Sequence, residues 1–326
     1  MNYGTLWASG HAAATHQNPY AAYPESHRVD FSRYGGPVDS PDLNLNPPFT
    51  LPVLQLLSHL TIYTFVKVWV AGMWFCLSAA ITLIYRKEPS IQGRRIVWLS
   101  VSTLPLFALS SGQVYAPLFL LSTLSLHFYK DNRNLAAAIA IGLLVAMRPT
   151  MIFWPVCLYF AGHRRVAFIA TGTILVLYAL PLPFYGTAIY HQWLAAAQHD
   201  IHWMDISNIS LLAVARRLGA QWPGILIATM LAIAAIVWVR RYRPGFVPVS
   251  GIALCLGILV VPIGWSFYTL FLAPYFAARR WGWVATISGA AFFLPSEVLV
   301  KTSGIPLLLA VLLMLGIFMA QARSRI

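Results

Sequence analysis

The sequence predicts an all-α polytopic membrane protein, and three observations support this prediction. First, 59% of its 326 residues are hydrophobic and only 10% are charged, whereas a soluble domain carries about 25% charged residues. Second, the apolar residues fall in long runs of the kind that form transmembrane helices. Third, most charged residues lie between those runs. Too little polar surface remains to coat a water-soluble globule, so we expect a bundle of about 11 transmembrane helices.

The apolar runs define the expected helices, and several of them are short. A helix needs about 20 residues to cross a hydrocarbon core of about 30 Å. We interpret the shorter runs as helices that are broken at Pro or Gly. Broken backbone within a membrane is tolerated where it is buried in protein or lines a cavity, so the pattern predicts an internal cavity. The runs cover residues 51–85, 96–110, 114–128, 135–147, 150–161, 166–184, 222–240, 247–262, 266–278, 282–294 and 304–321.

The net charge of +13 arises from short basic clusters between the apolar runs. Clusters of this kind mark cytoplasmic loops under the positive-inside rule, so we expect no nucleic-acid partner. If each cluster lies in the cytoplasm, the topology alternates consistently and the C-terminus is cytoplasmic. Most acidic residues then fall on the outer side. The clusters cover residues 86–95, 130–133, 163–165, 240–243, 278–280 and 323–325.

We expect two regions: a first external loop over residues 1–50 and a multi-pass transmembrane domain over residues 51–326. The loop does not read as a secretory signal, because it lacks a charged start followed by an apolar core. An odd number of spans with a cytoplasmic C-terminus predicts a further transmembrane helix before Met1. Three cysteines lie in apolar runs, where we expect buried thiols rather than a disulfide framework: Cys76, Cys157 and Cys255.

The candidate catalytic carboxylates lie in the first external loop. Asp30, Asp39 and Asp42 precede the first apolar run. A carboxylate at the membrane surface can serve as a general base that deprotonates an acceptor hydroxyl. The alternative for each residue is a solvated loop acid.

Arg148, in the segment AMRPTMIF, lies between two apolar runs and apart from the basic clusters. An isolated arginine at membrane depth is costly and indicates function, and its planar guanidinium suits a phosphate. The alternative is a side chain that extends to the membrane interface. Gln113 follows Gly112 at another helix break and is a candidate to bind a sugar or phosphate oxygen, or else to cap a helix.

Two further outer segments carry candidate substrate-binding residues. The segment 199–219 places His199, Asp200 and His202 at a spacing that suggests a metal, but it supplies no clear further ligand or second-shell support, so we expect no metal. Asn208 and Ser210 in the same segment match a helix N-cap. The segment PIGWSFYTLFLAP holds aromatic side chains that fit either a sugar-stacking wall or an interfacial aromatic belt: Trp265 and Tyr268.

In their order, spacing and expected outer-face placement, six segments together resemble glycosyltransferase family 87, a family of GT-C fold transferases that use polyprenol-phosphate sugars. In the family, the segment that corresponds to RPT more often reads Lys-Pro, so Arg148 keeps a cation at this position. The segment that corresponds to NIS often reads Asn-Gln-Ser, so Asn208 and Ser210 match. The segments are NPYAAY (18–23), NPPF (46–49), SGQVYAPLFLLSTLSL (111–126), AMRPTMIFWP (146–155), NISLLAVARRL (208–218) and PIGWSFYTLFLAP (262–274).

The resemblance implies a membrane hexosyltransferase without a cofactor, in which a polyprenyl-phosphate sugar, mannose above all, is transferred to a lipid or glycan acceptor on the outer face. Arg148 would hold the donor phosphate, helped by Arg216 or Arg217. The cell membrane of a bacterium is the expected location.

Two departures from the family leave alternatives open. Met1 and Asn2 stand almost where the family has its presumed catalytic Asp, just after the family's first helix, which we expect before Met1. Phe267 stands where a His is frequent. The alternatives are a transporter or flippase of a lipid-linked sugar and a catalytically degenerate family member.

Overall fold

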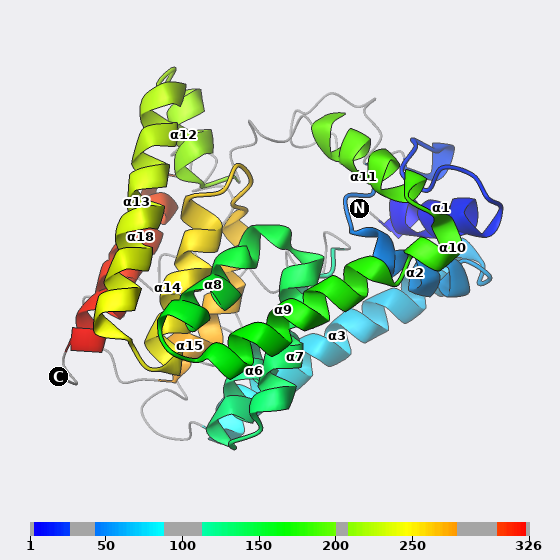
Figure 1. Ribbon diagram of the computed structural model, residues 1–326. Coiled ribbons are helices and arrows are strands. Elements are labelled where there is room, and N and C mark those ends of the chain that lie inside the picture. Colours follow the sequence, from blue (N-terminus) through cyan, green and yellow to red (C-terminus); the bar gives the residue numbers. More distant parts are fainter. Residues whose placement is uncertain (1–2, 27–42, 88–112, 200–207, 279–304, 324–326) are drawn as a thin grey trace. The chain divides into compact units, whose positions relative to one another are not determined.

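The computed structural model describes residues 3–26, 43–87, 113–199, 208–278 and 305–323 (Figure 1). Its elements in these ranges are α-helices and 3-10 helices, which confirms the all-α prediction. The chain divides into two compact units. The first unit comprises Met1–Phe75, Phe107–Ala116 and Leu175–Asp200, and the second comprises Cys76–Leu106, Pro117–Ile174 and Ile201–Ile326.

The first unit begins with a helix that the sequence does not predict. Helix α1 (Tyr3–Ala14) packs against α2 (Leu51–Leu57). The two helices approach closely because Gly10 has no side chain, and a Cβ there would overlap the carbonyl oxygen of Leu54. The buried face of α1 therefore consists mostly of small residues, and the sequence of this helix shows only a weak hydrophobic periodicity.

The other elements of the first unit are short except for the start of α3. The predicted run 51–85 is divided between α2 and α3, because residues 58–61 leave the helical path. The elements are η1 (Pro24–Ser26), η3 (Pro48–Thr50), the first part of α3 (Ile62–Lys87), the end of α9 (Arg164–Ala179), α10 (Leu182–Tyr185) and α11 (Ala188–His199).

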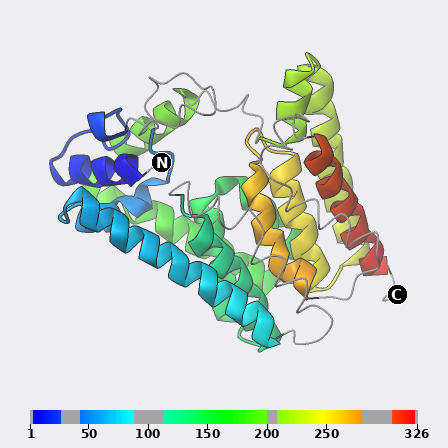
Figure 2. The same cartoon turned by 180° about the vertical axis from the view of Figure 1, so that it is seen from behind.

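In the second unit, α14 (Phe246–Leu259) is the central helix. Nearly every one of its residues is buried. It packs against α8 (Phe153–Phe160) and against α18 (Ile305–Arg323), beside which it runs in both ribbon views (Figures 1 and 2). The remaining elements of this unit are α6 (Tyr115–Lys130), α7 (Asn134–Met147), η4 (Pro149–Ile152), α12 (Leu211–Arg217), α13 (Gln221–Tyr242), η6 (Ser266–Leu272) and α15 (Ala273–Ala277).

Among the described residues, three helical segments are long and apolar enough to cross a membrane: Ile62–Arg86, Arg164–Tyr185 and Gln221–Tyr242. Five further apolar helices are shorter, among them Asn134–Met147 and Phe246–Leu259. This mixture confirms a polytopic membrane protein with short or broken helices. The three cysteines are free thiols; Cys157 and Cys255 are buried and Cys76 is half-buried.

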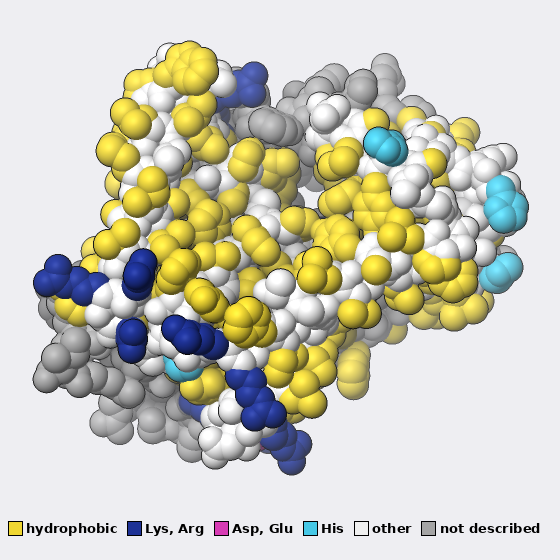
Figure 3. All heavy atoms as spheres, in the orientation of Figure 1, with side chains coloured by type: hydrophobic (Ala, Val, Ile, Leu, Met, Phe, Trp, Pro, Cys, Tyr) yellow, Lys and Arg dark blue, Asp and Glu magenta, His cyan; other side chains and the backbone are white. Residues whose placement is uncertain are grey.

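Most of the Lys and Arg side chains seen in Figure 3 (dark blue) lie along the lower part of that face, and a further group lies at its top. The basic clusters that the sequence places in the cytoplasm occur at helix ends in this unit, after α6, before α9 and after α13. Their shared position agrees with a common membrane side for these clusters.

Candidate active site

Arg148 occupies the single position between helix α7 and the 3-10 helix η4. Proline disfavours helical geometry in the residue before it, and Arg148, which precedes Pro149, has φ −134° and ψ 85°. The Arg148 side chain is only 9% exposed, and its Nη1 donates a hydrogen bond to the Met147 carbonyl at 3.1 Å. The break therefore holds a buried guanidinium.

The length of α7 bears on the depth of Arg148 in a membrane. The helix has 14 residues, which at a rise of 1.5 Å per residue span roughly 21 Å. The hydrocarbon core is about 30 Å thick. If the basic cluster 130–133 marks one membrane surface, α7 ends before it reaches the other. Arg148 then lies at a depth where an arginine is costly unless it binds a partner.

A second helix break lies beside the first. Helix α14 ends at Leu259, and η6 begins at Ser266. Gly257, near the end of α14, faces η4: a Cβ there would come within 2.6 Å of Met151 Sδ and 3.2 Å of the Thr150 carbonyl oxygen. In η6, the hydroxyl of Tyr268 interacts electrostatically with Arg148. The absence of a side chain at Gly257 thus lets the two breaks meet.

Asn208 holds the backbone of the second break in place. Its Oδ1 accepts a hydrogen bond from Gly264 N at 2.9 Å, and its Nδ2 donates to the Pro262 carbonyl at 2.9 Å. The backbone of Asn208 also pairs with Trp265 in an isolated antiparallel bridge. Gly264 is required there, because a Cβ would overlap the Ile258 carbonyl oxygen. The fully buried amide therefore satisfies backbone groups that no helix satisfies.

Ser210 and Arg217 attach helix α12 to the second break. Ser210 is the N-cap of α12, and its Oγ accepts from Ala213 N at 3.1 Å. From the last turn, Arg217 Nη1 donates to the Asn208 carbonyl at 2.9 Å. These contacts connect both ends of α12 to the second break.

Residues 44–262 match the family model of glycosyltransferase family 87. The match extends over more than half of the chain, and it includes Arg148 with its helix break and the Asn208–Arg217 segment. The chain belongs to glycosyltransferase family 87. It is therefore a membrane glycosyltransferase by family. The comparisons with curated proteins and with solved structures gave no match.

In this family-87 transferase, the structure brings together two groups of the predicted site residues. Arg148 lies close to Tyr268, while Asn208 contacts Ser210, Arg217 and the backbone of Trp265. All of these residues belong to the second unit. The predicted aromatic wall is only partly accessible, because Tyr268 is 4% exposed and stacks on Phe271, whereas Trp265 is half-buried.

Two other predicted residues have no contact with these groups among the interactions described above. Arg216 is exposed on α12, next to the half-buried Arg217. Gln113 precedes α6 and belongs to the first unit.

The candidate bases Asp30, Asp39 and Asp42 lie outside the described residues and before the family match. Asp200 and His202 also lie outside the described residues, and the described part of the chain holds no group of three potential metal-binding side chains.

The sequence analysis missed Ser266, the first residue of η6. It is 1% exposed, and its Oγ has no hydrogen-bond partner among the described residues. A buried hydroxyl of this kind can bond a ligand oxygen. The available signal was its place directly after Trp265 at a predicted helix break.

Proposed function

We propose that this family-87 transferase moves a mannose residue from a polyprenyl-phosphate donor to a lipid or glycan acceptor on the outer face of a bacterial cell membrane. The observation that carries the proposal is the buried Arg148 at a helix break. A guanidinium offers two parallel N–H groups that match two phosphate oxygens. A break in an apolar bundle is where a lipid-linked phosphate can meet such a cation without crossing water.

The chemistry is a displacement at the anomeric carbon of the donor sugar. The acceptor oxygen forms the new glycosidic bond, while the bond between the anomeric carbon and the phosphate oxygen breaks. The electron pair leaves with the phosphate, whose negative charge grows, and Arg148 stabilises that charge. The acceptor proton passes to a carboxylate of the first external loop, for which Asp30, Asp39 and Asp42 are the candidates.

The test is transfer of radiolabelled mannose by purified protein in proteoliposomes that contain polyprenyl-phosphate mannose and a membrane lipid extract. We expect a new glycosidic product with the wild type and a loss of at least about 100-fold with Arg148→Ala, because removing one electrostatic stabiliser costs that much. Arg148→Lys should retain part of the activity. Arg133→Ala removes an exposed arginine from the other end of α7 and should retain all of it.

The alternatives predict different results in the same assay. A flippase would move labelled donor between leaflets without forming a glycosidic product. A degenerate member would do neither. Normal transfer by Arg148→Ala would remove the phosphate role of this residue. Other polyprenyl-phosphate hexoses, tested in parallel, establish whether mannose is preferred, and a preference for another sugar would overturn that part of the proposal.

A further inference from the structure

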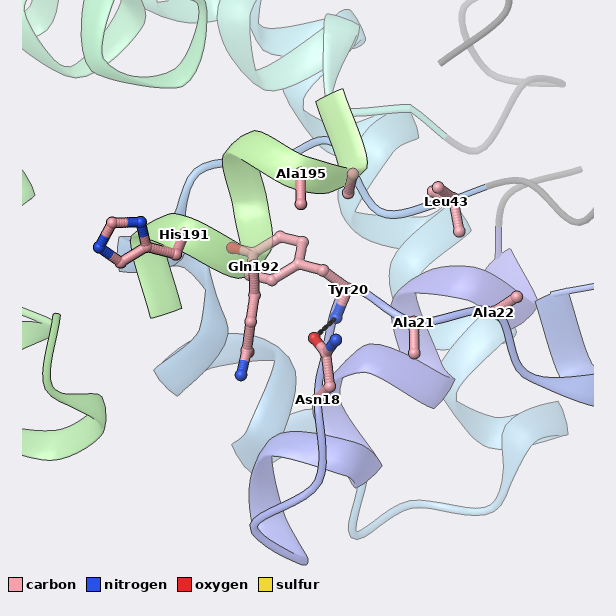
Figure 4. Close-up of a pocket in the computed structure, with 9 residues that line it drawn as sticks. Asn18, Tyr20, Ala21, Ala22, Leu43, His191, Gln192 and Ala195 are labelled. Atoms are coloured by element: carbon pink, nitrogen blue, oxygen red, sulfur yellow. Dashed lines mark hydrogen bonds between the residues drawn. The ribbon is translucent and has the colours of Figure 1, made fainter. Parts of the chain in front are cut away.

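The described residues of the first unit line a cavity of about 480 Å³, which lies within the range of about 300–1,000 Å³ that is typical of small-molecule sites. One wall is the loop after α1 and the other is helix α11. Figure 4 shows Tyr20 between Asn18 and α11, with Gln192 extending from the helix. The lining residues are Asn18, Tyr20, Ala21, Ala22, Leu43, His191, Gln192, Ala195 and Ala196.

The chemistry of the lining indicates a neutral ligand. Among the described residues, no Asp, Glu, Lys or Arg lines the cavity, and its polar side chains are the amides of Asn18 and Gln192, the Tyr20 phenol and the His191 imidazole. The alanine side chains leave room for a ring and present methyl groups to its C–H faces. Amides both donate and accept hydrogen bonds, so they suit neighbouring hydroxyl groups better than a phosphate.

Gln192 has an unused hydrogen-bond acceptor. Its Oε1 is buried and accepts no hydrogen bond from the described residues. Leaving such an atom unsatisfied costs free energy. A hydroxyl group of a ligand is a donor that removes this cost.

The walls of the cavity are fixed before any ligand arrives. Asn18 Oδ1 accepts from Tyr20 N at 2.9 Å, and the Tyr20 hydroxyl donates to the Asn46 carbonyl at 3.1 Å. On the other wall, Trp193 Nε1 donates to the Leu45 carbonyl at 3.0 Å. A preformed site lowers the entropic cost of binding.

We infer that this cavity binds a neutral sugar unit of the acceptor. The inference deepens the proposed function and, in its acceptor part, rests on it. The loop that contains Asn18 and the segment that contains α11 both fall on the expected outer side of the membrane, where the acceptor would be glycosylated. The cavity thus offers neutral hydrogen-bonding groups to the hydroxyl groups of the acceptor. The proposed site of the donor phosphate instead offers the cation of Arg148.

The test measures binding of mannobiose to the full-length protein in nanodiscs by saturation-transfer-difference NMR. Gln192→Ala removes an amide, and Ala195→Trp fills the cavity. The matched control is Gln198→Ala, which removes an exposed glutamine from the same helix outside the cavity. We expect the wild type and the control to bind mannobiose. Gln192→Ala should bind it about tenfold more weakly, because a polar contact is lost, and Ala195→Trp should bind it at least as weakly, because the indole occupies the space of the sugar ring.

The same variants are then assayed for transfer. Gln192→Ala should raise the acceptor KM about tenfold and leave the donor KM unchanged. If the cavity variants bind mannobiose more weakly but no preparation forms a glycosidic product, the sugar site is supported and the proposed transferase function is wrong. Product formation with an unchanged acceptor KM, or equal mannobiose binding by wild type and cavity variants, would overturn the inference. Absence of mannobiose binding by the wild type would overturn it as well.

Discussion

The two helix breaks of the second unit are built alike but carry different side chains. Each follows a 14-residue α-helix, α7 or α14, and each leads into a 3-10 helix, η4 or η6. The first break consists of Arg148 alone. The second spans Val260–Trp265 and is held by the neutral amide of Asn208 from a distant part of the chain.

The difference predicts a structural role for the second break and a functional role for the first. At the second break, Asn208 bonds backbone groups that a helix would otherwise satisfy, so the amide is needed for the fold. At the first break, the Arg148 guanidinium donates a hydrogen bond to the carbonyl of its neighbour Met147, and a buried charge generally does not improve stability. We therefore expect substitutions at the second break to reduce stability and substitution of Arg148 to reduce activity.

Gly264→Ala should cause the largest loss of stability. Its Cβ would overlap the Ile258 carbonyl oxygen and lie 3.2 Å from Ser210 Cβ, and overpacking of this kind costs about 3 kcal/mol. Thermal unfolding in detergent measures the effect. The control Gly172→Ala places a Cβ on α9 with no neighbour within 4 Å and should unfold at the same temperature or slightly higher. Equal melting temperatures for the two variants would contradict the structural role of Gly264.

Asn208→Ala should cost nearly as much, about 2–3 kcal/mol, because it removes several hydrogen bonds and leaves buried backbone groups unpaired. Asn208→Asp keeps the acceptor for Gly264 N but loses the donor to the Pro262 carbonyl, so an intermediate melting temperature is expected. Gln221→Ala, at an exposed position at the start of α13, is the control. If Asn208→Ala and Gln221→Ala unfold at the same temperature, the Asn208 amide does not stabilise the second break.

Ser122→Ala should have a smaller effect on the second break. Ser122 Oγ, on α6, donates to the Phe271 carbonyl of η6 at 2.7 Å, and loss of one such bond costs about 1 kcal/mol. Thr171 instead bonds the carbonyl of Ala167 within its own helix, so Thr171→Ala should change the melting temperature less. A larger effect from Thr171→Ala would contradict this ranking.

The stability of the protein should depend slightly on pH because of His163. This residue follows the C-terminal end of α8, whereas Arg148 precedes the N-terminal end. Burial lowers the pKa of His163 below its usual value near 6.5, an effect that a backbone hydrogen bond to Pro244 partly offsets. The unfolded chain therefore takes up the proton first, and the stability contributed by the neutral histidine is lost as pH falls below about 6.5. Melting temperatures between pH 7 and pH 5 should fall less in His163→Gln than in the wild type and in the exposed control His191→Gln.

The sequence predicted the first break better than the second. At residues 147–150, apolar runs flank an Arg-Pro pair, and proline ends a helix, so the break was visible locally and Arg148 could be named as a candidate there. The role of Asn208 was not visible, because its partners Pro262 and Gly264 lie more than fifty positions away in the chain. Sequence reasoning assigned Asn208 and Ser210 to helix capping or substrate binding; the capping prediction is confirmed for Ser210.

The first unit was predicted least well. Helix α1 was missed because Gly, Ala and Ser form its buried face, and such residues give little hydrophobic contrast between the two sides of a helix. The divided run 51–85 was read as one helix because only residues 58–61 interrupt it. The cavity was invisible for the same reason as the second break, since Asn18 and Gln192 are far apart in the chain.

The most direct test of the account is the affinity of the protein for polyprenyl phosphate, measured by competition against a fluorescent analogue in nanodiscs. Arg148→Met keeps an unbranched, flexible stem and removes the guanidinium with its charge. The account predicts that this variant binds polyprenyl phosphate about 10- to 100-fold more weakly than the wild type, as expected for a lost charged hydrogen bond, with an unchanged or higher melting temperature. Equal affinity, or a large loss of stability with unchanged affinity, would show that Arg148 supports the fold and does not bind the donor.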